Sequence, residues 1–146
     1  PNLRTLEMSF CLNLRSPDFS NDSLVTIDLS WCTALIDSGL LSMYQCKSLQ
    51  RVILAGCSSL EEPFLDARAL QLLDMSSCTR LRDQGVQQIV GHCPSLEKLI
   101  LRKCDSLHDP LGITLSGSAF DPTNAPGQID LRDCAQLQDG YDSFVG

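Results

Sequence analysis

Positive charge is scarce in this sequence of 146 residues, which has 11 lysines and arginines against 18 aspartates and glutamates. The net charge is therefore −7. Because proteins bind nucleic acids mainly by neutralising phosphates with lysine and arginine, this balance argues against nucleic acid as the main partner. Long apolar runs are also missing: no stretch approaches the roughly 18 residues needed to cross a bilayer, so no membrane partner is expected.

Motifs that carry chemistry are absent as well. The sequence has no G-x-S-x-G nucleophile turn and no glycine-rich phosphate loop ending in Lys-Ser or Lys-Thr. His92, Cys93, Cys104 and His108 fall in one region, but no two cysteines have the C-x₂₋₄-C spacing of structural zinc sites. We therefore expect no metal, no cofactor, no small-molecule substrate and no enzymatic activity.

What the sequence does contain is one pattern, L-x-x-L-x-L-x-x-C-x-x-L, in which Ile, Val or Met can replace leucine. It occurs six times, with its cysteine at Cys11, Cys32, Cys57, Cys78, Cys104 and Cys134. Self-similarity of this kind indicates an array of stacked units in which each unit contacts only its neighbours. We expect residues 1–146 to form one such domain. Because Pro1 enters the pattern without a polar capping unit, we also expect it to be a segment of a longer array.

The cysteines follow from the same pattern. Equivalent positions in stacked strands lie about 4.7–4.9 Å apart, a distance that does not by itself exclude a disulfide. Side chains that point in parallel into a core do not, however, present their sulfurs to one another. We therefore interpret the cysteines as buried free thiols that fill the core as small apolar groups. Free thiols are typical of a reducing compartment, so we expect the cytoplasm or nucleus.

Long and short repeats alternate along the chain. The second and fourth repeats are long and continue into apolar residues that predict a helix, in the second repeat after Asp37 or Ser38, either of which could cap it, and in the fourth after Asp83. Proline in the short returns, at Pro17 and Pro63, argues against helices there. The segment 109–127 is rich in Gly, Pro and Ser and predicts an irregular loop insertion, either functional or simply mobile.

These elements together resemble a known family. The strand with its cysteine, the Leu-x-Asp-x-Gly start of the long returns and the Cys-Lys-Ser-Leu and Cys-Pro-Ser-Leu entries resemble the cysteine-containing leucine-rich repeats of F-box/leucine-rich-repeat proteins. The resemblance implies an α/β solenoid, an arc with six parallel strands on its concave side and helices in the long repeats only. In F-box relatives this arc holds the protein to be ubiquitinated. The short repeats are also similar to those of plant intracellular immune receptors.

The residues that the repeat leaves free are the candidates for binding. Alternate side chains of a strand face opposite ways, so residues between the core leucines should face the concave surface. The expected central row is Glu7, Asp28, Ile53, Asp74, Ile100 and Asp130. The entry row, on one side of it, is Thr5, Thr26, Arg51, Leu72, Lys98 and Gln128. The exit row, on the other side, is Ser9, Ser30, Ala55, Ser76, Arg102 and Arg132.

Within these rows, apolar and mixed-charge positions point to a protein partner. Ile53, Leu72 and Ile100 are apolar where solvent is expected, which indicates a contact patch. Asp28, Asp74, Arg51, Lys98 and Arg102 add both signs of charge, which suit a specific protein partner better than a polyanion.

Phe10 and Trp31 directly follow their strands. As aromatics they either anchor an interface or pack against the bend after the strand. The sequence thus predicts a non-catalytic protein-binding module, by resemblance the substrate-recognition part of a ubiquitin ligase. The alternatives are a structural scaffold in a large complex and the sensor region of an intracellular immune receptor.

Overall fold

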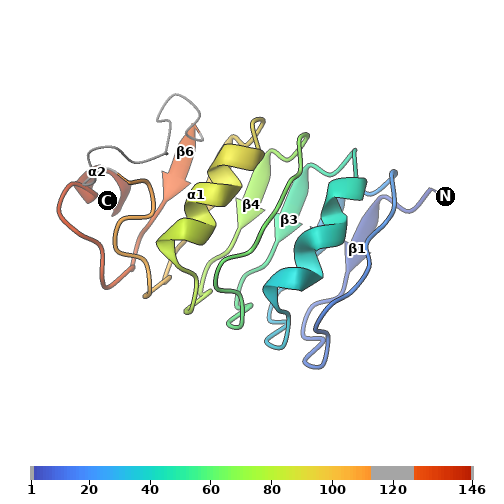
Figure 1. Cartoon of the computed structure of the whole chain (residues 1–146), viewed down its shortest axis with the longest axis horizontal. Helices are drawn as coiled ribbons and strands as arrows, with labels where there is room; N and C mark the ends of the chain where they lie inside the picture. Colours follow the sequence, from blue (N-terminus) through green and yellow to red (C-terminus); the bar gives the residue numbers. More distant parts are fainter. Residues whose placement is uncertain (1, 113–126, 146) are drawn as a thin grey trace.

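The computed structural model describes residues 2–112 and 127–145, and its framework is one open parallel sheet (Figure 1). Its six strands pair in sequence order, from β1 to β6. They are β1 (Thr5–Glu7), β2 (Thr26–Asp28), β3 (Arg51–Ile53), β4 (Leu72–Asp74), β5 (Lys98–Ile100) and β6 (Gln128–Asp130). Each strand with its return to the next is called a coil here. The predicted α/β class and the six parallel strands are confirmed.

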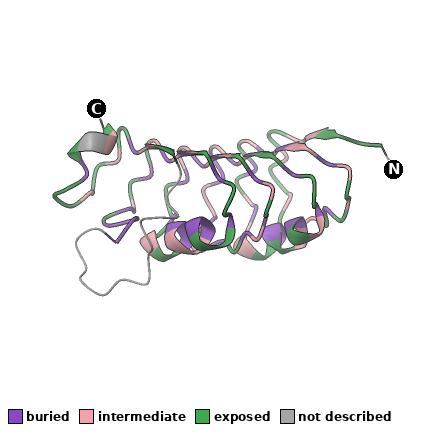
Figure 2. Cartoon of the chain, turned by 90° about the horizontal axis from the view of Figure 1, so that it is seen from above, coloured by how far each residue is buried: buried purple, intermediate pink, exposed green. Residues whose placement is uncertain are grey.

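Helices occupy the returns of the two long repeats (Figure 2), on the side of the molecule opposite the strands. The second coil carries η1, a 3₁₀-helix over Asp37–Gln45, and the fourth carries α1 over Asp83–His92. The first has nine residues and the second ten. A 3₁₀-helix rises about 2.0 Å per residue against 1.5 Å for an α-helix, so the tighter form lets the shorter return span a similar distance.

A third helix corrects the expectation that only the long repeats are helical. Residues Asp142–Val145 form a short helix, α2, which packs against β6. The backbone amide of Leu131 donates to the carbonyl of Phe144 at 3.2 Å, which ties this helix to the last strand. A segment of four residues is too short to show a helical period in the sequence, so this element could not be inferred from apolar spacing.

One apolar core fills the space between the sheet and the returns. The strand residues that face it, such as Ile27, Val52 and Leu73, are fully buried, as are the pattern leucines that follow each strand. In the first coil the equivalent Leu6 and Met8 are only half-buried, because no earlier coil covers them. The predicted alternation of core and outward residues along each strand is therefore confirmed.

All eight cysteines are free thiols, and they do more than fill space. From the second coil onward, the Sγ of the pattern cysteine donates a hydrogen bond to a backbone carbonyl of the preceding coil: Cys32 to Met8, Cys57 to Leu29, Cys78 to Leu54, Cys104 to Met75 and Cys134 to Leu101, over 2.9–3.2 Å. Buried thiols thus link neighbouring coils as donors. The interpretation of the cysteines as purely apolar filler was incomplete for this reason.

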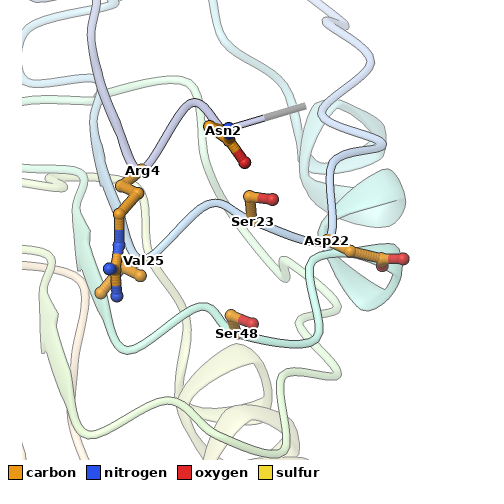
Figure 3. Close-up of a pocket in the computed structure, with 6 residues that line it drawn as sticks. All are labelled: Asn2, Arg4, Asp22, Ser23, Val25 and Ser48. Carbon is orange, nitrogen blue, oxygen red and sulfur yellow. The ribbon is translucent and has the colours of Figure 1, made fainter.

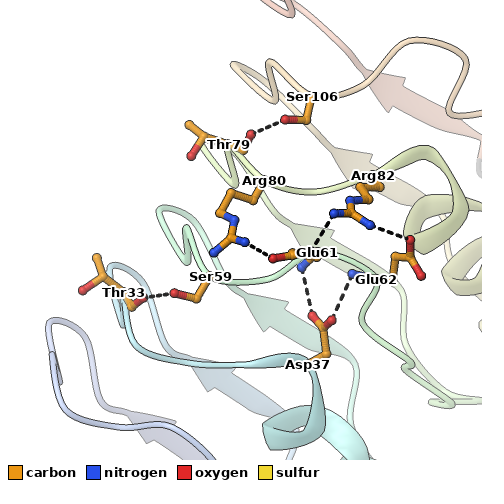
Figure 4. A network of polar contacts seen from close by, with 9 residues as sticks. All are labelled: Thr33, Asp37, Ser59, Glu61, Glu62, Thr79, Arg80, Arg82 and Ser106. Atoms are coloured by element: carbon orange, nitrogen blue, oxygen red, sulfur yellow. Dashed lines mark hydrogen bonds and ion pairs between the residues drawn. The ribbon is translucent and has the colours of Figure 1, made fainter.

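Two aspartates clamp successive coils together, and Figure 4 shows the first of them, Asp37. Asp37 accepts hydrogen bonds from the backbone amides of Glu61 and Glu62 at 2.9 and 3.1 Å. Asp83 repeats the arrangement with the amides of His108 and Asp109, at 2.9 and 3.0 Å. The expectation that Asp37 or Ser38 caps the helix was therefore wrong: neither helix has a side-chain hydrogen bond at its N-cap, and Asp37 and Asp83 both bind the next coil.

The glycine of the Leu-x-Asp-x-Gly segment permits a close approach to the coil before it. A Cβ on Gly39 would lie 2.7 Å from the carbonyl oxygen of Arg15, and one on Gly85 would lie 3.0 Å from that of Glu61. The helix start is thus held on both sides, by backbone contact with the preceding coil and by the aspartate clamp on the next.

The predicted loop insertion at 109–127 lies mostly outside the described residues, which stop at Gly112 and resume at Gly127. Its first residues belong to the core. Asp109 is buried and accepts a hydrogen bond from the hydroxyl of Tyr141 at 2.5 Å, and the same hydroxyl accepts one from the amide of Leu111 at 2.9 Å. The start of the segment is therefore fixed against the C-terminal end of the described chain.

Candidate interaction surface

The face of the sheet that points away from the helices, here called the open face, carries the three predicted rows. Strand pairing places the central row in register, from Glu7 through Asp28, Ile53, Asp74 and Ile100 to Asp130. The entry row is in register in the same way, so Leu72 pairs with Arg51 on one side and Lys98 on the other. The sequence therefore located this surface correctly, while its role in binding stays a prediction.

The apolar positions of the open face alternate with charged ones. Ile53 and Ile100 are half-buried, and Asp74 separates them in the central row. Leu72, also half-buried, lies in the neighbouring row between two cations. The three residues expected as one apolar patch are thus spaced one strand apart.

The carboxylates of the central row are largely satisfied by their own strands. Asp28 accepts hydrogen bonds from the amide and hydroxyl of Ser30, at 2.9 and 2.6 Å, and Asp74 accepts one from the amide of Ser76 at 2.9 Å. These bonds turn both carboxylates toward the exit row.

At the end of the central row Asp130 bonds the Arg132 guanidinium, which lowers the pKa of that carboxyl below its usual value. In the exit row, the Nη2 atom of Arg102 forms an ion pair with the Oδ2 atom of Asp133 at 3.4 Å.

Two cations of the entry row stand apart from these pairs. Arg51 is exposed and Lys98 is half-buried, and neither side chain has a hydrogen bond or ion pair with any residue that the structure describes. They lie on β3 and β5, with Leu72 of β4 between them. Their charge is consequently available to a ligand.

These two cations line a shallow hollow of about 420 Å³ at the start of the strands. Its lining is completed by Leu72 and Gln128 of the predicted entry row and by three residues that sequence reasoning did not single out, Gln50, Gln71 and Glu97. Three of these, Gln50, Gln71 and Glu97, immediately precede a strand, and the carbonyl of each accepts backbone amides from the next coil. Their repeated position before each strand was the signal in the sequence that could have found them.

A second hollow of about 450 Å³ lies at the same edge of the sheet, near the N-terminus (Figure 3). Residues of three successive coils line it, namely Asn2, Arg4, Asp22, Ser23, Val25 and Ser48. Its hydroxyl, amide and guanidinium groups can hydrogen-bond a polar chain. Both hollows are therefore open, polar depressions beside the open face.

The two aromatic candidates behave differently. Trp31 packs against the next coil, since a Cβ placed on Gly56 would lie 2.3 Å from its ring atoms, yet 44% of the residue stays exposed. Phe10 is 67% exposed. Both adopt a positive φ, of 62° and 60°. The alternative of packing against the bend after the strand is thus realised at Trp31, while Phe10 presents its ring to solvent.

Within residues 2–112 and 127–145, no group of three or more His, Cys, Asp or Glu side chains is placed to hold a metal ion. The described helices include none with the length and apolar character needed to cross a bilayer. No protein-family model matches the chain. No curated protein matches it in sequence either.

Proposed function

We propose that this chain is a non-catalytic protein-binding module that captures its partner on the open face. The observation that carries the proposal is the in-register stack of outward side chains, in which Ile53 and Ile100 are partly accessible and the Arg51 and Lys98 side chains have no partner among the described residues. A fixed backbone that displays apolar and charged groups in rows can bind a protein surface without reorganising, which lowers the entropic cost of association.

The proposed architecture is a leucine-rich-repeat arc with the open face on its inner side. The repeated contacts between coils support it: the same thiol-to-carbonyl bond joins successive coils, and the same aspartate clamp follows the second and fourth strands. Each coil thus uses equivalent contacts to hold its neighbour, as stacked repeats do.

By resemblance, the proposed role is substrate recognition for a ubiquitin ligase of the F-box type, in the cytoplasm or nucleus. The features that support this choice are the Leu-x-Asp-x-Gly segments of the two helical coils and the eight free thiols. The fold alone does not select this role, because repeats of this shape serve many unrelated binding proteins.

A second candidate is a scaffold in a large complex or the sensor region of an intracellular immune receptor. It is favoured by the returns of the first and third coils, which contain Pro17 and Pro63 and no helix. The domain that accompanies this chain in the full-length protein separates the candidates: an F-box supports substrate recognition, a nucleotide-binding domain supports the receptor, and neither supports the scaffold.

The test of the binding surface is capture of a partner from cell extract, identified by mass spectrometry. Replacing Ile53 and Ile100 with Asp should abolish capture, because two new charges would oppose the apolar contacts. The matched control is Leu41→Asp/Tyr44→Asp, which places the same two charges on exposed residues of η1, on the opposite side of the molecule. Circular dichroism must show both proteins folded. Equal capture by the Ile53→Asp/Ile100→Asp protein would assign binding elsewhere.

A further inference from the structure

Two strands of the open face, β3 and β5, present the same kind of side-chain pair. β3 presents Arg51 and Ile53, and β5 presents Lys98 and Ile100 at the same register positions. The intervening β4 presents Leu72 and Asp74 instead. A ligand that crosses the strands therefore meets the same pair, a cation beside an isoleucine, on alternate strands.

The distance between these two pairs restricts the conformation of such a ligand. Neighbouring strands lie about 4.8 Å apart, so equivalent residues on β3 and β5 are about 9.6 Å apart. A polyproline II helix has three residues per turn and rises about 3.1 Å per residue, which brings every third side chain to the same side after about 9.3 Å. In an extended strand, by contrast, residues three apart point to opposite faces. The spacing therefore matches a polyproline II segment.

The charges of the site restrict the amino-acid sequence of the ligand. Arg51 and Lys98 are unpaired within the part of the chain that the structure describes, whereas the Asp28 and Asp74 carboxylates are turned away toward Ser30 and Ser76.

Glu97 lines the same hollow and contributes the one opposing charge of its lining, which leaves an excess of one positive charge there. The remaining lining groups are the side chains of Gln50, Gln71, Gln128 and Leu72, which can hydrogen-bond a peptide backbone and contact apolar rings.

We propose that the hollow across β3 to β6 binds an acidic polyproline II segment of the partner protein, with a carboxylate at every third residue. One carboxylate pairs with Arg51 and the next with Lys98. Proline rings between them pack on Leu72. This inference rests on the proposed function, since it names the chemistry of the partner that the open face captures.

The test is fluorescence anisotropy with labelled synthetic peptides and the whole chain. The probe peptide carries Glu at every third position with Pro between, and the matched peptide has the same composition with its Glu residues adjacent. We expect the periodic peptide to bind at least about tenfold more tightly, because only its carboxylates reach both cations. Its affinity should also fall as salt is raised.

Variants identify the contacts. Arg51→Ala and Lys98→Ala should each weaken the periodic peptide about tenfold, since each removes one charge-assisted contact. The control Arg68→Ala removes the same charge from an exposed side chain outside the hollow and should leave the affinity unchanged. Equal binding of the two peptides, or an equal loss with Arg68→Ala, overturns the proposal.

A single-stranded oligonucleotide of equal charge is the remaining competitor. If the oligonucleotide displaces the labelled peptide at the same concentration as unlabelled peptide does, the site responds to negative charge alone. The proposal of a periodic acidic segment is then refuted. The proposed function fails separately: it depends on whether Ile53→Asp/Ile100→Asp abolishes partner capture. Absence of peptide binding together with loss of capture in that protein would reject this inference and retain the proposed function.

Discussion

The indole of Trp31 lies directly over the backbone of Gly56 in the next coil, so close that a Cβ at position 56 would fall 2.3 Å from ring atoms Cδ2 and Cε3. Both residues occupy the same place in their coils, immediately before the pattern cysteine, and both have a positive φ. The equivalent residues elsewhere are Phe10, Ser77, Lys103 and Asp133, which also have a positive φ. Glycine is therefore required at position 56 by the ring above it as well as by its dihedral angle.

Gly56→Ala should destabilise the protein by about 1–3 kcal/mol, because the new methyl overlaps the Trp31 ring and the φ of 76° disfavours alanine. Urea unfolding followed by circular dichroism measures the change. The control is Gly91→Ala, whose Cβ meets nothing within 4 Å in helix α1 and which should gain up to about 1 kcal/mol. Equal midpoints for the two variants would contradict the close packing at position 56.

Lys103→Gly tests the cost of the positive φ alone. Lys103 is exposed and has a φ of 57°, a conformation that costs a residue with a Cβ about 1–2 kcal/mol. Glycine adopts it freely but gains entropy in the unfolded chain, so we expect a net stabilisation below about 1 kcal/mol. Lys103→Ala, which keeps the Cβ, should show no gain in the same urea titration. A higher stability of Lys103→Ala would indicate that the loss of the lysine charge, and not the backbone conformation, causes the stabilisation.

Asp83→Ala removes the clamp on the fifth coil. Two charge-assisted hydrogen bonds to the amides of His108 and Asp109 are lost, and we expect a destabilisation of about 2–3 kcal/mol. Asp22→Ala is the control, because this exposed carboxylate has no hydrogen bond or ion pair to described residues. Amide hydrogen exchange should show faster exchange at residues 108 and 109 in the Asp83 variant. Unchanged protection there would rule out the clamp.

The buried thiols should make stability depend on pH on the alkaline side. Burial raises the pKa of Cys57 and Cys104 from an ordinary value near 9 to about 12, and raises that of Cys93 to about 11. The native state therefore holds these protons more tightly than the unfolded state. The resulting stability is fully present below pH 9 and is lost as the pH rises from about 9 to about 12.

Thiol titration and urea unfolding at a series of pH values check this prediction. At pH 8 a thiol reagent should react slowly with the six buried cysteines of the folded protein, all except the half-buried Cys11 and Cys134, and rapidly with all eight once it is unfolded without reductant. The urea midpoint should fall between pH 8 and pH 10. Eight thiols that titrate equally fast before and after unfolding would show that they are not buried.

The framework was predictable because one periodic signal determines most of it. Positions such as Val52 and Leu73 recur at a fixed offset from each cysteine, so the strands, the core and the outward rows follow from the pattern. The returns after Asp37 and Asp83 were located for the same reason, although apolar spacing did not distinguish the 3₁₀-helix of the first from the α-helix of the second.

Contacts between coils were not predictable in the same way. An aspartate at the start of a helix is typical of a cap, and only the placement of the next coil shows that its amides lie closer to Asp37 and Asp83. The sequence likewise placed Arg51, Lys98 and Arg102 on one face, but which of these cations lacks a partner depends on side-chain positions. The hollow itself depends on the stacking of several coils, and its only trace in the sequence is the recurrence of Gln50, Gln71 and Glu97 directly before their strands.

The alternation of coils with and without an aspartate clamp has a consequence for changes in chain length. A coil that carries the clamp is followed by one that supplies the two amides, as Asp37 is by Glu61 and Glu62. Loss or gain of one coil would place two coils with a clamp aspartate, or two coils without one, next to each other. It would also disturb the alternation of isoleucine and aspartate along the central row. Viable size variants should therefore differ by whole pairs of coils.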